Sequence, residues 1–465
     1  MEKNTLTRKY GLFTAICMVV GIVIGSGVFF KAETVLEKTG GNMPLGVLAW
    51  LIGGAIMLVC LLSFSFMGQK YEKVNGVVDY AEATVGPRYG YLMGWFIGTI
   101  YFPAMSAVLA WLSARYTLEF IVAVNPSLPL LIPAAEGGCI VGPECIALAL
   151  LYMCLLYGMN VLSPKLAGKF QTSATVIKLI PLGLMAVVGI IYGLVTGGLY
   201  ENMTTPAVVQ GVSSSPLFAS VCATAFAYEG WIIATSINSE IKDSKKNLPK
   251  ALVLGGFIII AVYLLYYIGV AGGATNQELV DNGTTVAITN VFGNVLGKIL
   301  LLFVAISCLG TGNGLMLGCT RCMYSLAARG NGPAPEVFEQ VDPKTNMPTS
   351  SSVFALMVTG AWFLFFYLSQ LAGTLGSGIF AFDSSELPII TVYLMYFPIL
   401  IQWMRKATDQ NALRRYVLPA LALCGCAFMV LACAVSHKEK CLGYLIVFAV
   451  VMALGVLANR KKKLQ

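Results

Sequence analysis

The chain has 465 residues, of which 57% are hydrophobic and only 11% charged, and its mean hydropathy is +0.79. A soluble domain carries about 25% charged residues, so this composition excludes a soluble globular protein and indicates a membrane protein. The formal net charge of +8 is spread over short loops. That distribution is typical of membrane topology and of contact with anionic lipids, and it excludes a nucleic-acid-binding surface.

Apolar stretches long enough to cross the hydrocarbon core, about 20 residues, recur twelve times. They are continuous and rich in Leu, Ala and Gly, whereas the strands of a membrane barrel are about 10 residues of alternating polarity. The sequence therefore predicts an all-α polytopic membrane protein with twelve transmembrane helices. We expect these spans near residues 11–31, 44–67, 91–114, 144–162, 173–197, 216–238, 251–273, 295–320, 350–371, 386–404, 416–436 and 441–459.

The basic residues predict the orientation of these spans. If the N-terminus is cytoplasmic, most of the 30 Lys and Arg residues fall in inner segments, as Lys70, Lys242 and Arg405 do. The positive-inside rule then places both termini in the cytoplasm. We expect the protein to lie in the cell membrane. We expect the first apolar segment to remain as a span, because it is too long for the apolar region of a cleavable signal.

The first span is interrupted by Gly25, Ser26 and Gly27. Two interpretations are open. Gly21 and Gly25 form a G-x-x-x-G pattern, which is typical of close helix packing in membranes. Alternatively, the helix opens at the glycines and presents bare N–H and C=O groups to a solute, as in the broken helices of secondary transporters.

The sixth span carries a second interruption, where Glu229 stands beside Gly230 about halfway across. Two interrupted spans that lie five spans apart predict two inverted repeats of five helices. The repeats cover about residues 11–197 and 216–404, with helices eleven and twelve added at about 416–459. All of them belong to one transmembrane domain.

Ionisable residues inside a membrane are costly and usually functional. Lys178 and Glu229 are the two that cannot easily reach the interface. Lys178 either snorkels to the inner surface or acts as a fixed cation on the carbonyls of the opened first span, in the place of a sodium ion. Glu229 is either a protonated packing residue, a proton-coupling group, or an anionic contact for a basic substrate.

Other polar residues leave open alternatives. Ser307 and Thr311 in the eighth span either pack against the first span or lie near the cation site. Asp383 and Glu386 are expected to be solvated or to cap a helix. Cys139 and Cys145 lie in an outer loop and either form a local disulfide or remain free thiols. The remaining cysteines are mostly inside spans, where Cys packs as a small apolar residue.

No catalytic or metal-binding motif appears in the sequence. It contains no HExxH, no paired CxxC and no Walker motif, and its single histidine, His437, falls in a short outer loop. We therefore expect no enzymatic activity, no metal and no cofactor.

Four motifs occur in order along the chain and carry a family resemblance. They are G-S-G-V-F at Gly25–Phe29, F-A-Y-E-G-W at Phe226–Trp231, the loop at Glu240–Pro249, and R-x-x-Y-x-x-A-R-x-G at Arg321–Gly330. With them the chain resembles the amino acid, polyamine and organocation (APC) superfamily, and within it the bacterial relatives of the L-type amino-acid transporters. The resemblance runs through nearly the whole chain.

The resemblance implies how an amino acid binds. Its α-carboxylate would meet the backbone N–H groups of Ser26 and Gly27 and the hydroxyl of Ser26. Its α-amino group would meet carbonyls of Ile22 and Phe226, and Phe226 would gate the substrate. Lys178 matches a fifth-span lysine of sodium-independent members. The implied substrate residues are Ile22, Gly25, Ser26, Gly27, Phe226, Ala227, Tyr228 and Glu229, and the implied coupling residues are Lys178, Ser307 and Thr311.

Three positions depart from the family pattern, and we expect none of them to touch the site. Lys31 replaces a proline after the first motif, Val77 and Val78 alter a glycine-rich signature, and Ser244 replaces a proline after Asp243. Glu229 varies among L-type relatives: some carry Gly or Ala there, and one that takes cystine and dibasic amino acids carries an acid.

These observations predict a sodium-independent amino-acid transporter that works by alternating access, either as an exchanger or with protons. The alternatives are a cationic amino-acid or polyamine permease, a non-transporting sensor, and a pore. A pore would need a polar stripe through several spans, whereas the polar groups here gather at one level. The expected partners are the amino-acid substrate and membrane lipids, and nothing in the sequence indicates an accessory subunit.

Overall fold

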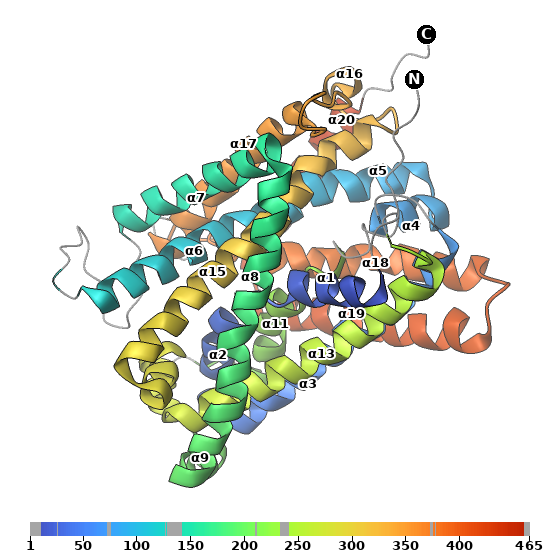
Figure 1. The fold of residues 1–465 in the computed structure, drawn as a ribbon. Helices are drawn as coiled ribbons and strands as arrows, with labels where there is room; N and C mark the ends of the chain where they lie inside the picture. The colour runs from blue at the N-terminus through green and yellow to red at the C-terminus, as the bar shows by residue number, and fades with distance from the viewer. Residues whose placement is uncertain are drawn as a thin grey trace.

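The computed structural model describes residues 11–25, 27–71, 76–125, 127, 142–209, 212–232, 241–372, 375–376 and 378–459. Helices make up most of this part of the chain (Figure 1). Ten of its helical segments are long and apolar enough to cross a membrane. The predicted all-α polytopic membrane class is therefore confirmed.

The first half of the chain forms a bent helix pair followed by long helices, two of which contain a π-helical turn. Its elements are α1 (Leu12–Val23), α2 (Gly27–Lys38), α3 (Met43–Lys70), α4 (Val77–Thr84), α5 (Pro87–Phe96), a π turn at Ile97–Tyr101, α6 (Phe102–Val124), α7 (Pro143–Leu162), α8 (Pro164–Leu184), a π turn at Met185–Gly189, α9 (Ile190–Thr196) and α10 (Gly198–Thr204).

The second half begins with a short helix, and its longest helix bends at Gly293, where φ is +73°. Its elements are α11 (Pro216–Tyr228), α13 (Ser244–Gly273), α14 (Asn276–Asn282), α15 (Thr285–Ala327), α16 (Pro335–Phe338), α17 (Thr349–Phe366), a π turn at Tyr367–Leu371, α18 (Leu387–Lys406), a π turn at Leu413–Val417, α19 (Leu418–His437) and α20 (Lys440–Ala458).

The first and sixth predicted spans differ from the ten helical segments that are long enough to cross a membrane. The axes of α1 and α2 differ by 46°, so the first apolar window contains two helices. In the sixth window α11 has only 13 residues, and residues 233–238 of that window lie outside the described ranges. Cys139 also lies outside them, whereas Cys145 is buried in α7. The proposed disulfide therefore stays a prediction.

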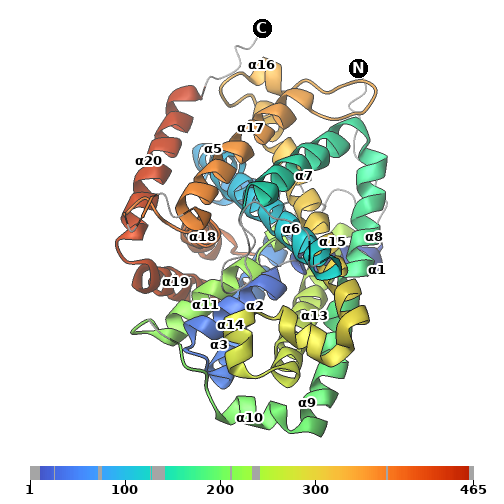
Figure 2. The same ribbon diagram turned by 90° about the vertical axis from the view of Figure 1, so that its left-hand side faces the viewer.

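The helices pack in two groups that meet around α1, α2 and α11. In one group α13 packs against α3 and α1, and α11 packs against α2, α3 and α19. In the other group α15 lies against α6, α8 and α17. Figure 2 shows α20 and the α8–α9 segment at opposite edges, with α6, α11 and α15 between them. Both broken segments therefore lie inside the molecule.

The π turn between α5 and α6 has a local cause and brings Tyr101 into the interior. Pro103 has no N–H and its ring clashes with the carbonyl of the residue four positions earlier, Thr99. The indole N–H of Trp362 in α17 donates to that carbonyl at 2.8 Å. A backbone group that the proline leaves without a helical donor is thus satisfied from a neighbouring helix, and Tyr101 is fully buried.

Candidate substrate site

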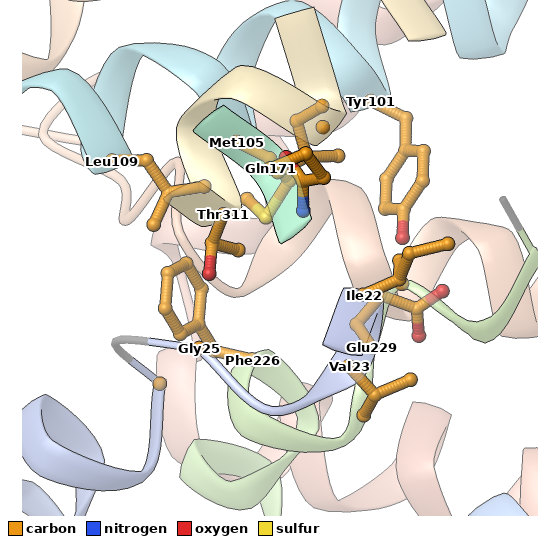
Figure 3. A pocket seen from close by; sticks show the side chains of 14 residues that line it. Ile22, Val23, Gly25, Tyr101, Met105, Leu109, Gln171, Phe226, Glu229 and Thr311 are labelled. Atoms are coloured by element: carbon orange, nitrogen blue, oxygen red, sulfur yellow. The ribbon is translucent and has the colours of Figure 1, made fainter. Parts of the chain in front are cut away.

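A cavity of about 40 Å³ lies where α1 and α11 end (Figure 3). Six segments of the chain supply its walls: the first break, the second break, the π turn that ends at Tyr101, α6, α8 and α15. Ligand pockets usually measure about 300–1,000 Å³, so side chains must move before an amino acid can enter. The lining residues are Ile22, Val23, Gly25, Gly27, Tyr101, Met105, Leu109, Gln171, Phe226, Glu229, Gly230, Thr311, Gly314 and Leu315.

The first break leaves helix carbonyls that need donors. The helix α1 ends at Val23 because Ile24 is extended, with ψ of 109°, and the Ile24 N–H donates to Val20 at 2.8 Å. The last four carbonyls of a helix have no partner within it, and an unsatisfied carbonyl is costly in a membrane. The ammonium of Lys178 donates to the Gly21 carbonyl, and the Tyr263 hydroxyl lies 3.0 Å from the Val23 carbonyl.

Lys178 points into the protein, toward the break in the first span. It lies in α8, its exposed fraction is 0%, and the Gly21 carbonyl accepts its hydrogen bond. A snorkelling lysine would instead keep its ammonium in water. Among the described residues of α8, Lys178 is the only buried basic side chain, and it lies at the end of α1.

The second break forms at Glu229 and Gly230. The helix α11 ends at Tyr228, Glu229 is extended with ψ of 170°, and Gly230 has φ of +103°. A side chain at Gly230 would strain this backbone, so the glycine permits the turn. The Tyr228 hydroxyl donates to the Trp50 carbonyl at 2.9 Å and so fastens the end of α11 to α3.

Tyr263 of α13 joins the two breaks. Its hydroxyl lies 3.0 Å from the Val23 carbonyl and 2.9 Å from the Ala227 carbonyl. A phenolic hydroxyl has one proton, so these two carbonyls share a single donor. The sequence did not identify this residue, because nothing in the pattern of α13 distinguishes one of its several tyrosines from another.

Gly25 and Gly27 are close to atoms that leave no space for a side chain. A Cβ at Gly25 would lie 2.3 Å from Oγ1 of Thr311, and one at Gly27 would lie 2.6 Å from Cα of Ala227. The first break is therefore closely packed, and the helix also ends there. Both interpretations of the glycines thus describe part of the structure. Ser26 lies outside the described residues.

Glu229 presents a carboxylate to the cavity. Its exposed fraction is 7%, and the Tyr101 hydroxyl and the Gly230 backbone N–H face its oxygens. The Tyr101 hydroxyl lies at the same cavity and points toward the Glu229 carboxylate (Figure 3). A buried carboxylate of this kind can accept a proton or a cationic group.

Thr311 lies at the cavity, and Ser307 lies one turn earlier in α15. The Thr311 hydroxyl donates to the Ser307 carbonyl at 3.1 Å. Ser307 is fully buried, and its hydroxyl has no partner among the described residues. A polar chain continues from the cavity wall, where Asn313 donates to Oε1 of Gln171 at 2.9 Å and Asn160 donates to Oδ1 of Asn313 at 2.9 Å.

The prediction that Lys31 does not touch the site is wrong. Phe226 packs edge-on against Phe30 at 6.2 Å between ring centroids, and Lys31 lies over both rings, with Nζ 5.6 Å from the Phe226 centroid and 5.0 Å from the Phe30 centroid. The exposed fraction of Lys31 is 1%. Since α2 is helical through this position, the lysine side chain turns inward and covers the aromatic residue at the cavity.

The expectation that Glu386 is solvated or caps a helix is also wrong. Its exposed fraction is 0%, it makes no capping hydrogen bond at the start of α18, and it pairs with Lys31 at 2.7 Å and Lys38 at 3.1 Å. His437, expected in a loop, is the last residue of α19, and its Nε2 lies 3.0 Å from Glu386. Lys31 and Glu386 are 355 positions apart, so local patterns could not reveal the pair.

The broken helices, the buried lysine at the first break and the cavity between them are features of a polytopic membrane carrier. The chain belongs to the amino acid permease family, whose model matches residues 10–457. This family lies within the APC superfamily, so the predicted resemblance is confirmed, and the protein is an amino-acid transporter of the membrane.

Several curated transporters are similar to the chain over most of its length. The serine/threonine exchanger SteT of Bacillus subtilis is 27% identical over 95% of this chain and 94% of its own. The human Asc-type amino acid transporter 1 is 24% identical over 99% of this chain and 85% of its own length. The human large neutral amino acids transporter small subunit 2 is 26% identical over 76% of this chain and 64% of its own length. These relatives are transporters, which agrees with the expectation of a non-enzymatic protein.

We predict that Tyr263→Phe lowers both stability and transport. The change leaves the Val23 and Ala227 carbonyls without their shared donor, which costs about 1–3 kcal/mol. Thermal unfolding in detergent and amino-acid uptake in proteoliposomes measure the two effects. Tyr267→Phe is the matched control, because the Tyr267 hydroxyl on the same helix has no partner among the described residues. Equal behaviour of the two variants would contradict the role given to Tyr263.

We also predict that Gly27→Ala abolishes uptake while the protein still reaches the membrane. The added Cβ would lie 2.6 Å from the Ala227 backbone, so α2 and α11 must separate at the site. Gly183→Ala in α8 is the control, since no atom lies within 4 Å of its added Cβ. Uptake by Gly27→Ala at the level of the Gly183→Ala control would show that the close approach of the breaks is unnecessary.

Proposed function

We propose that the chain transports amino acids across the cell membrane without sodium, by alternating access and with exchange as the favoured mode. The contact of Lys178 with the Gly21 carbonyl carries this proposal. A cation at this place neutralises the carbonyl end of α1 and holds the break open. A covalently attached ammonium does so permanently, so no sodium ion is needed.

The geometry of the breaks suits the two charges of an amino acid. The helix α2 starts at Gly27, and the first N–H groups of a helix attract a carboxylate. The carbonyl end of α1 at Ile22 and that of α11 near Phe226 suit an α-amino group. We therefore propose that Ile22, Gly25, Ser26, Gly27, Phe226, Ala227, Tyr228 and Glu229 bind the substrate, with Ser307 and Thr311 beside the Lys178 cation.

The architecture that we propose has twelve spans, with both termini cytoplasmic. The ten continuous spans are joined by two interrupted ones, α1–α2 and the segment that starts with α11. Residues 11–197 and 216–404 would form the inverted repeats, and residues 416–459 the added pair. The similarity to a serine/threonine exchanger over 94% of that protein supports exchange.

Ion pairs that join separate helices on both sides of the cavity support alternating access. On the outer side in this orientation, Lys31 of α2 pairs with Glu386. On the inner side, Arg329, just after α15, pairs with Asp79 and, at 3.3 Å, with Glu82 of α4. We propose that the two sets of pairs break in turn as the groups of helices move.

A second candidate function is the transport of cationic amino acids. The Glu229 carboxylate lines the cavity and pairs with no basic side chain in the described part of the chain, which favours a positively charged substrate group or a proton as its partner. The two functions differ in the side chain that the substrate presents to Glu229.

Replacement of Lys178 tests the sodium-independent proposal. We expect Lys178→Ala to abolish sodium-free uptake, because the Gly21 carbonyl loses its donor and the cavity loses its cation. Uptake of a radiolabelled amino acid into proteoliposomes provides the measurement. The exposed Lys169 of the same helix supplies the control variant Lys169→Ala, which should retain full uptake. Full uptake by the Lys178 variant would refute the proposal.

Replacement of Glu229 separates the two substrate classes. If Glu229 contacts a cationic side chain, Glu229→Gln lowers arginine uptake about tenfold and leaves alanine uptake unchanged. If it carries a proton, the variant loses the pH dependence of alanine uptake instead. Both are read from uptake at two pH values, with Glu201→Gln in the exposed α10 as control. Unchanged specificity together with unchanged pH dependence would exclude a functional role for Glu229.

A further inference from the structure

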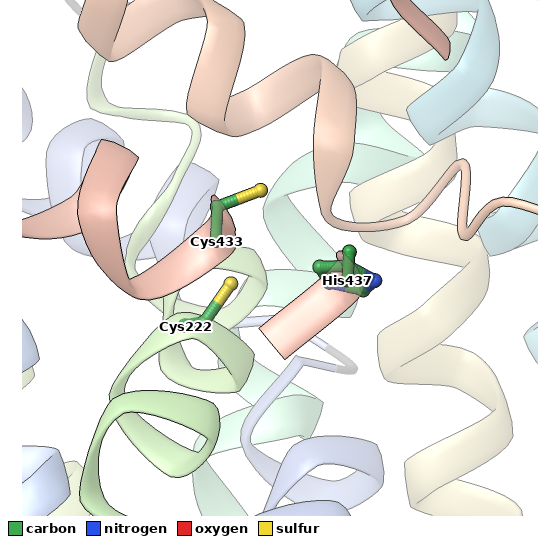
Figure 4. Close-up of side chains that lie close together, drawn as sticks. All are labelled: Cys222, Cys433 and His437. Atoms are coloured by element: carbon green, nitrogen blue, oxygen red, sulfur yellow. The ribbon is translucent and has the colours of Figure 1, made fainter. Parts of the chain in front are cut away.

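Two cysteines and the single histidine of the chain meet between α11 and α19. One ligating atom from each of Cys222, Cys433 and His437 lies within 4.8 Å of the others (Figure 4). Cys433 and His437 are four residues apart in α19, which places them on one face of the helix. Cys222 approaches them from α11, so the group joins two separate parts of the chain.

The surroundings of this group add further ligand atoms and orient the histidine. The Glu386 carboxylate lies 3.0 Å from Nε2 of His437 and 3.7 Å from the Cys222 sulfur. The sulfur of Cys441, at the start of α20, lies 3.8 Å from the Cys433 carbonyl. The exposed fractions of Cys222 and Cys433 are 0% and 4%, so both thiols are shielded from water.

From this arrangement we propose that Cys222, Cys433 and His437 bind a zinc ion. Thiolate and imidazole are the ligands that structural zinc prefers, at about 2.3 Å and 2.0–2.1 Å. Zinc at these distances requires its ligand atoms to be about 3.8 Å apart or less, which small side-chain rotations from the present positions can reach. Cys441 is the further sulfur for the fourth position.

Glu386 lies beside both the histidine and the Cys222 sulfur and orients the imidazole. A carboxylate that accepts from one imidazole nitrogen fixes the other nitrogen toward the metal, which is the usual arrangement of zinc-bound histidine. Glu386 takes this place through its contact with Nε2 of His437, and the ammonium groups of Lys31 and Lys38 hold the carboxylate. The two lysines also offset the negative charge of bound thiolates.

The proposed zinc site can be reached from the surface, and a bound ion would link two helices. A surface hollow lined by Ser436, His437, Lys438, Glu439 and Lys440 reaches the histidine at the turn between α19 and α20. A metal ion can enter there without crossing the protein. Bound zinc ties α11, the helix that ends at the cavity, to α19.

Metal binding by the purified protein tests the proposal independently of transport. We expect the full chain, kept reduced and stripped with a chelator, to take up one equivalent of Zn²⁺. With Co²⁺ as a spectroscopic probe it should show thiolate-to-cobalt charge transfer and the visible bands of a tetrahedral site. Cys222→Ser, Cys433→Ser and His437→Gln should each weaken binding at least tenfold. Cys424→Ser is the matched control, because Cys424 is an exposed cysteine of α19 outside the group.

Three results would overturn the zinc site. The first is the absence of Zn²⁺ binding by the reduced wild-type protein. The second is binding that the Cys222, Cys433 and His437 variants retain as fully as the Cys424 control. The third is a disulfide between Cys222 and Cys433, found by mass spectrometry of protein isolated without reductant, that persists when Zn²⁺ is present. Each variant is checked by size-exclusion chromatography, so loss of binding is compared only among folded proteins.

Discussion

The structure depends on how the open helix ends are satisfied inside a membrane. A break in a span leaves carbonyls that lipid cannot hydrogen-bond, and each such group costs several kcal/mol. Here the donors come from other helices: Lys178 of α8 reaches the Gly21 carbonyl, and Tyr263 of α13 reaches the carbonyls of Val23 and Ala227. These donors hold the ends of α1 and α11 in position.

The ionisable residues Lys31, Glu386 and His437 lie next to the cavity residue Phe226 or are connected to it. Phe226 lines the cavity and packs against Phe30, Lys31 lies over both rings, and Lys31 pairs with Glu386. Glu386 in turn contacts His437, so the aromatic cover is connected to the Cys and His group between α11 and α19. Removing one member of a buried ion pair leaves the other charge buried and unpaired. A substitution of Lys31 or Glu386 should therefore disturb the packing of Phe226 at the cavity.

The sequence predicted those parts of the site that leave a local signal. Glycines within an apolar span predicted the first break, and Gly230 beside Glu229 predicted the second. Lys178 was identified because a lysine inside an apolar span is unusual. Tyr263 could not be found, because a tyrosine in a membrane helix carries no sign of which carbonyl it contacts. Lys31 and Glu386 were misjudged for a related reason. Each stands near the end of a span, where a charge is usually solvated, and only the fold brings them together.

The central claim is that a fixed ammonium at the first break takes the place of a bound sodium ion. Equilibrium binding of a radiolabelled amino acid to the purified protein tests this most directly, with sodium replaced by choline at constant ionic strength. The account predicts the same dissociation constant in both solutions, because Lys178 is present in each. Binding that requires sodium, or that tightens in proportion to it, would contradict the account.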